Sequence, residues 1–113
     1  MLLSTDVWVG ALLRRAEMGG AFCVVARKGD PRAGAVLVRT VSRPAGEVRL
    51  FSEAMARDGE RVWIQPHPGA DEAALDAYVE RSVRIDPDLW VVEIEDREGR
   101  HFLTEKVEPA DGR

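Results

Sequence analysis

The sequence predicts an α+β domain in which two helices pack on a mainly antiparallel sheet of five or six strands, in the element order α-β-β-β-β-α-β-β. Two stretches carry apolar residues at the 3.6-residue spacing of a helix. Several shorter runs, rich in β-branched and aromatic residues, are bounded by glycine and proline and are typical of strands. The chain has 113 residues, the length of one domain. We expect that domain to span residues 1–107 and a frayed tail to follow over residues 108–113.

Both helices have recognisable ends. The first begins at Ser4-Thr5-Asp6, because small oxygen-bearing side chains accept hydrogen bonds from the free N–H groups of a first helical turn. It ends at Gly19-Gly20, where glycine supplies the left-handed residue that closes a helix. The second is expected over residues 71–85. It stops before Asp86, because a residue that precedes proline avoids the helical region.

Four strands are expected between the helices, over residues 21–27, 35–41, 47–51 and 61–65. Short loops join the first three, which predicts an antiparallel meander, with residues 21–27 as a central strand because they are nearly continuously apolar. Residues 52–59 fit either a helical turn or an irregular connection. A strand over residues 89–94 and a hairpin return through residues 101–104 complete the sheet.

The apolar strands also predict an oligomer. We expect the two helices to cover one face of the sheet. The other face also needs cover, because residues 22–25 and 89–92 are apolar almost throughout. A homodimer that buries this second face is the prediction, since a large exposed apolar surface is unusual in a monomer.

Composition excludes several classes of protein. The net charge of −4 argues against general nucleic-acid binding, which needs a basic surface. No apolar run approaches the length of about 18 residues that spans a bilayer, so no membrane partner is expected. Cys23 is the single cysteine and excludes an intramolecular disulfide. The first residues lack the basic segment of a signal peptide, which favours a cytoplasmic protein.

No catalytic residue, metal site or cofactor is indicated. Cys23, His67 and His101 lie on separate elements and lack the spacing of zinc ligands. The element order alone resembles restriction-endonuclease-like cores, but the nearest match to their acid-x-lysine motif, Glu47-Val48-Arg49, has arginine in place of lysine. The sequence therefore favours a non-enzymatic binding or assembly module of the cytoplasm, with a possible protein partner. The alternative is a small metal-dependent nuclease or hydrolase, which would cluster acids around one cavity.

The candidate ligand-binding residues lie where the second predicted helix ends and the next strand begins. Two arginines three residues apart share a helix face, and two aspartates flank a proline just before a tryptophan: Arg81, Arg84, Asp86, Asp88 and Trp90. They could form the rim of a pocket that binds an anion or a peptide. Alternatively, the aspartates shape a turn and the arginines complement the negative end of the helix.

The chain also resembles a family of short bacterial proteins known as a domain of unknown function. The resemblance covers nearly the whole chain and is carried by the segments Asp6-Val7-Trp8-Val9, Leu12-Leu13-Arg14-Arg15, Gly20-Ala21-Phe22, Arg27-Lys28-Gly29-Asp30-Pro31, Gly34-Ala35-Val36-Leu37-Val38 and, above all, Asp86-Pro87-Asp88-Leu89-Trp90-Val91-Val92-Glu93-Ile94-Glu95-Asp96. It implies a stand-alone bacterial protein, with no activity or site residue to transfer.

Overall fold

A computed structural model describes residues 3–109 and confirms the predicted fold class and element order. The elements are α1 (Thr5–Met18), β1 (Phe22–Arg27), β2 (Val36–Ser42), β3 (Val48–Met55), β4 (Arg61–Ile64), α2 (Glu72–Ile85), β5 (Trp90–Asp96) and β6 (Lys106–Val107). The six strands form one mixed sheet in the order β1-β5-β2-β3-β4-β6. Three of its strand pairs are antiparallel, while β2–β5 and β4–β6 are parallel.

The strand order contradicts two expectations. The predicted meander of the first three strands is wrong, because β5 lies between β1 and β2. The predicted central position of β1 is wrong as well, because β1 is an edge strand. The cause is the α2 crossover, which returns the chain to the sheet so that β5 runs parallel to β2 and antiparallel to β1. β5 is therefore an interior strand, and five of its seven residues are buried.

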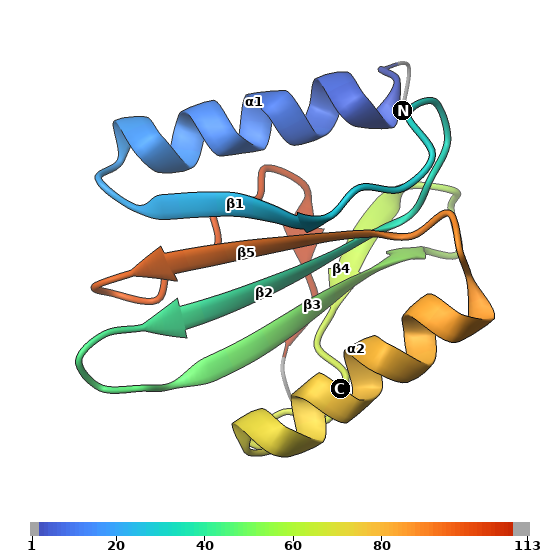
Figure 1. Cartoon of the computed structure of the whole chain (residues 1–113). Coiled ribbons are helices and arrows are strands. Elements are labelled where there is room, and N and C mark those ends of the chain that lie inside the picture. Colours follow the sequence, from blue (N-terminus) through green and yellow to red (C-terminus); the bar gives the residue numbers. More distant parts are fainter. Residues whose placement is uncertain (1–2, 110–113) are drawn as a thin grey trace.

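The two helices lie on opposite sides of the sheet (Figure 1). On one side, α1 packs on alternate residues of the central strands and forms a core cluster with Val36, Val38, Phe51 and Val92. On the other side, α2 contributes Leu75, which is buried outside that cluster. The expectation of two helices on one face is thus wrong, and with it the reason given for a dimer through an uncovered face.

The first turn of α1 is capped by the loop that joins β1 to β2. Ser4 is the N-cap residue, but its side chain makes no capping hydrogen bond. Instead, the backbone N–H of Thr5 donates to the carbonyl of Arg32 (3.1 Å) and that of Asp6 to the carbonyl of Pro31 (2.9 Å). The hydroxyl of Thr5 also donates to the carbonyl of Gly34 (2.9 Å). The helix therefore begins where the sequence predicts, but its first N–H groups donate to carbonyls of the loop and not to the capping side chain of Ser4.

Two segments differ from the predicted strands. Residues 52–55 extend β3 instead of forming a turn or an irregular connection, because they pair with β4. Residues 101–104 form no hairpin strand. They cross the face of the sheet that α1 covers, where Phe102 and Leu103 pack on the core. They then lead to β6 at the edge opposite β1. Beyond β6, the backbone N–H of Glu108 donates to the carbonyl of Trp63 (2.8 Å), while residues 110–113 of the predicted tail lie outside the described residues.

Candidate functional site

The candidate residues lie on the last turns of α2, in the turn that follows it and at the start of β5. Asp86 is the C-cap of the helix, and its side chain accepts a hydrogen bond from the backbone N–H of Asp88 (3.0 Å). Arg81 is exposed and lies over the ring of Tyr78. Within residues 3–109, neither Arg81 nor Arg84 forms an ion pair with these two aspartates. The arrangement supports the interpretation in which the aspartates shape a turn.

Trp90 anchors the turn to the loop between β1 and β2. Its indole N–H donates to the carbonyl of Asp30 (2.7 Å), and the backbone N–H of Asp30 donates to the carbonyl of Asp88 (2.9 Å). A Cβ atom at Gly29 or Gly34 would lie 2.1 Å or 2.4 Å from that same carbonyl oxygen. The two glycines are needed because the backbones approach so closely. Asp88 and Trp90, which belong to the segment that carries the family resemblance most clearly, therefore hold the turn before β5 against the loop between β1 and β2.

All three tryptophans are buried, as expected for core residues. Trp8 and Trp63 stack with ring centroids 5.5 Å apart. Both indole N–H groups donate to the carboxylate of Glu105, at 3.0 Å each. Burial alone would raise the pKa of Glu105, but the two hydrogen bonds outweigh it and the pKa lies below its ordinary value. Sequence reasoning missed this contact because Glu105 lies 97 residues from Trp8.

A second carboxylate belongs to the same region. Glu53 accepts from the backbone N–H of Val36 (2.7 Å) and pairs with Arg61 (3.2 Å). Burial raises the pKa of Glu53, although Arg61 and the Val36 N–H act in the opposite direction. Each oxygen of Glu53 and of Glu105 thus has a donor within the protein, which is typical of structural carboxylates.

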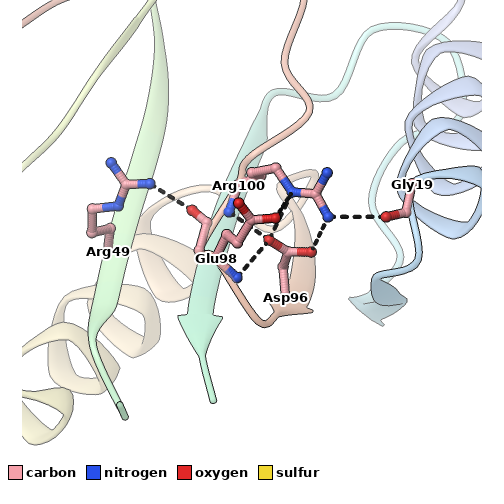
Figure 2. Close-up of polar contacts among 6 residues, drawn as sticks. Gly19, Arg49, Asp96, Glu98 and Arg100 are labelled. Carbon is pink, nitrogen blue, oxygen red and sulfur yellow. Dashed lines mark hydrogen bonds and ion pairs between the residues drawn. The ribbon is translucent and has the colours of Figure 1, made fainter. Parts of the chain in front are cut away.

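The loop after β5 is held by a buried carboxylate (Figure 2). Asp96 accepts from the backbone N–H groups of Glu98 (3.1 Å) and Arg100 (3.0 Å) and from the Arg100 guanidinium (2.9 and 3.0 Å). These bonds, the Arg100 side chain first, hold the pKa of Asp96 at about 2. Arg100 also donates to the carbonyl of Gly19 (2.9 Å), and Arg49 to that of Gly99 (2.6 Å). The network ties this loop to α1 and β3.

The features expected of a hydrolase are not assembled in the described part of the chain. Across residues 3–109, no three His, Cys, Asp or Glu side chains lie close enough to hold one metal ion. Glu47 is exposed just before β3, and Arg49 of the same motif is engaged with Gly99. No helix within these residues has the length and apolar character needed to cross a bilayer.

A hollow of about 530 Å³ lies between the start of β3 and the loop that leads into α2. Its walls include Val48, Leu50 and Leu75, and several of its polar side chains have partners within the protein. Asp71 accepts from the backbone N–H of Ala74, and Glu72 pairs with Arg39. His67, at φ 50°, lies edge-on to Tyr78. The hollow offers apolar walls but few free polar groups to orient a ligand.

The outer edge of β1 exposes apolar residues and has no pairing strand among the described residues. β1 pairs with β5 on one side, and no strand in the described chain pairs with the other. Phe22 is 66% exposed and Val25 36% exposed, and Ala26 is exposed as well. The opposite edge is β6, which has only two residues, one of them an exposed lysine. Short, lysine-bearing edges resist pairing with other chains, whereas longer apolar edges invite it.

An apolar hollow of about 410 Å³ adjoins this edge on the α2 side of the sheet. Four apolar side chains line it: Ala26 of β1, Val91 of β5, and Val79 and Val83 of α2. Its charged lining comprises Arg27, Glu80, Arg84 and Glu93. Arg84 is thus the one candidate residue from the sequence that borders this hollow.

Comparison with known proteins identifies the family. The model of a protein family of unknown function, DUF1491, matches residues 3–104. The chain belongs to the DUF1491 family. The crystal structure of a DUF1491 protein from Caulobacter crescentus CB15 is 70% identical, with a TM-score of 0.92 over 95% of this chain and 100% of that one. Its NMR structure gives 70% identity and a TM-score of 0.89 over 96% of this chain and 99% of that one.

A more distant structure shows how far the DUF1491 fold extends. The solution structure of protein Atu0922 from A. tumefaciens is 35% identical, with a TM-score of 0.80 over 97% of this chain and 99% of that one. The search of curated proteins finds no match. These findings agree with the resemblance stated from the sequence, and the family's function is unknown.

Proposed function

We propose that this protein is a non-enzymatic assembly module of the bacterial cytoplasm, which forms a homodimer through the outer edge of β1. The single observation that carries the proposal is that, among the described residues, no strand pairs with this apolar edge. In an antiparallel pair, every second residue directs its backbone N–H and C=O groups away from its partner strand. On the outer side of β1 these groups are available to another extended chain.

The composition of β1 favours a second copy as that chain. Five of the six residues from Phe22 to Arg27 are apolar, and the sixth, Arg27, donates to the carbonyls of Pro87 (3.0 Å) and Leu89 (2.7 Å). An antiparallel pair of β1 strands therefore opposes apolar residues and brings no like charges together. The result is an isologous interface, which is the commonest kind in soluble homo-oligomers.

The cytoplasmic location rests on the lone cysteine. Cys23 is buried and free, and burial raises its pKa to about 11, with Glu17 adding to the effect. A protein with one inert thiol and no disulfide is compatible with a reducing compartment.

Sedimentation equilibrium between about 5 and 500 μM tests the dimer, a range that spans the micromolar affinities of modest interfaces. We expect the wild-type chain to dimerise and a Phe22→Glu variant to be monomeric, because opposed copies would bury carboxylates at the edge. The matched control is Met55→Glu, which makes the same kind of change at a side chain 76% exposed on β3. The control should dimerise like the wild type. A wild-type monomer at the highest concentration would contradict the proposal.

A further inference from the structure

We infer that, in the proposed homodimer, the Phe22 side chain of each copy inserts into the apolar hollow beside Ala26 in the other copy. The inference rests on the proposed function and adds a register and a binding site to it. Its two elements are a protruding aromatic side chain at the start of β1 and an apolar hollow at the end of the same strand.

Symmetry limits the possible registers. A two-fold axis perpendicular to the sheet keeps corresponding faces on the same side, so the residue at the axis must lie opposite itself. If Val24 lies at the axis, Phe22 faces Ala26 of the partner subunit and Cys23 faces Val25 of the partner subunit. All five opposed residues are then apolar. If Val25 lay at the axis, Phe22 would face a lysine and Cys23 an arginine of the other copy.

The hollow selects the register centred on Val24. Phe22 and Val24 lie on the α2 side of the sheet, because both line a smaller hollow there with Glu72 of α2. Ala26 lines the larger hollow on that same side. Directly opposed residues have Cβ atoms about 4.5–5.5 Å apart, and an aromatic ring reaches diagonal neighbours at about 7–8 Å. Val91 lies on β5, one strand beyond β1 of that copy and about 10 Å from the strand that carries the ring, so the ring reaches Val91 by lying across Ala26.

The inserted ring explains features that the monomer leaves unexplained. Phe22 is 66% exposed, although it lines a hollow of about 130 Å³ in its own copy. The larger hollow is lined by Val79, Val83 and Val91, whose side chains offer an apolar surface to an aromatic ring. Buried aromatic residues that fill a partner's pocket are typical anchors of protein interfaces. The bulge between Val25 and Arg27 turns Ala26 and Arg27 toward the hollow at this point.

Isotope-filtered NMR on an equimolar mixture of ¹³C-labelled and unlabelled wild-type chains tests the inference. We expect intermolecular contacts from the Phe22 ring protons to the methyl groups of Val79, Val83 and Val91. Intermolecular contacts between β1 backbones without any from the Phe22 ring would overturn the inserted ring while leaving the β1 dimer intact. A mixture without intermolecular contacts, from a chain that sediments as a monomer, would overturn both.

A variant that closes the hollow provides a second test. Val83→Phe fills the space from within the same copy and should weaken the dimer at least about tenfold, because the Phe22 ring of the other copy no longer fits. The control Val7→Phe makes the same change at an exposed position on α1 and should leave the dimer dissociation constant unchanged. An unchanged constant for Val83→Phe would count against the insertion.

Discussion

Trp8 and Trp63 donate their indole N–H groups to the two oxygens of one carboxylate, that of Glu105. The rings also stack, so the first helix, the fourth strand and the segment before β6 meet at this point. Three elements distant in the sequence are thus joined by two hydrogen bonds to a charged group, which are stronger than bonds between neutral groups.

Replacing Glu105 with glutamine is therefore expected to destabilise the fold. The amide retains one acceptor oxygen, but its NH₂ group turns a donor toward one of the indole N–H groups. A buried donor without an acceptor costs about 1–3 kcal/mol. Urea denaturation of Glu105→Gln should show a free energy of unfolding lower by that amount. Glu60→Gln, an exposed change, is the control and should show no difference.

Stability should fall in acid because of Asp96. Its pKa in the folded protein, about 2, lies below the ordinary value of 3.8. A carboxyl group with a depressed pKa stabilises the fold fully above about pH 4 and loses that contribution as the pH falls toward 2. The contribution is about 1–2 kcal/mol.

An Asp96→Asn variant should be less stable than the wild type at neutral pH and should show a shallower loss between pH 4 and 2. Unfolding midpoints across that range measure the effect. Glu105 also has a lowered pKa, so the variant keeps part of the slope. Equal slopes in the two proteins would show that Asp96 is not the group that titrates.

Both helices and most of the strands were predictable because each depends on local sequence, whereas the last strand was expected over residues 101–104 and lies at Lys106–Val107. Asp71 caps α2 by accepting from the N–H of Ala74 (2.9 Å), and Asp86 before Pro87 ends it. The strand order was not predictable from local sequence, because only the α2 crossover decides that β5 lies between β1 and β2. An almost continuous apolar run predicts a central strand. In β1 that run belongs to an edge.

The candidate site, like the strand order, was only partly predictable from local sequence. The spacing of Arg81 and Arg84 places them on one helix face, but the partners of Asp86 and Asp88 are set by a turn and by a distant loop. The contact between Trp90 and Asp30 spans 60 residues, and no local pattern reveals it. Long-range hydrogen bonds hold this segment against the loop between β1 and β2, and the exposure of Phe22 becomes evident only once β1 is known to be an edge strand.

The thiol of Cys23 should react slowly in the native protein. Burial raises its pKa to about 11, so at pH 8 roughly one molecule in a thousand carries the reactive thiolate. Labelling with iodoacetamide, followed by mass spectrometry, should be slow under native conditions and rapid in urea. Cys23 is 6% exposed and faces the core, so the thiol is reached only when β1 opens. Rapid native labelling would mean that β1 detaches from β5.

Two glycine-to-alanine substitutions should change the stability of the fold in opposite directions. Gly34 lies tightly against the turn before β5, whereas Gly10 on α1 has open space beside it. In Gly34→Ala, the added Cβ would lie 2.4 Å from the Asp88 carbonyl oxygen and 2.9 Å from the Trp90 ring. Overpacking of this kind costs about 1–3 kcal/mol. Gly10 lies on α1, and a Cβ atom added there would have no neighbouring atom within 4 Å. Alanine also stabilises a helix relative to glycine by about 0.8–1 kcal/mol. Thermal unfolding should therefore move the midpoint down for Gly34→Ala and up for Gly10→Ala. A Gly34→Ala protein as stable as the wild type would show that the loop can move away from Trp90 without loss.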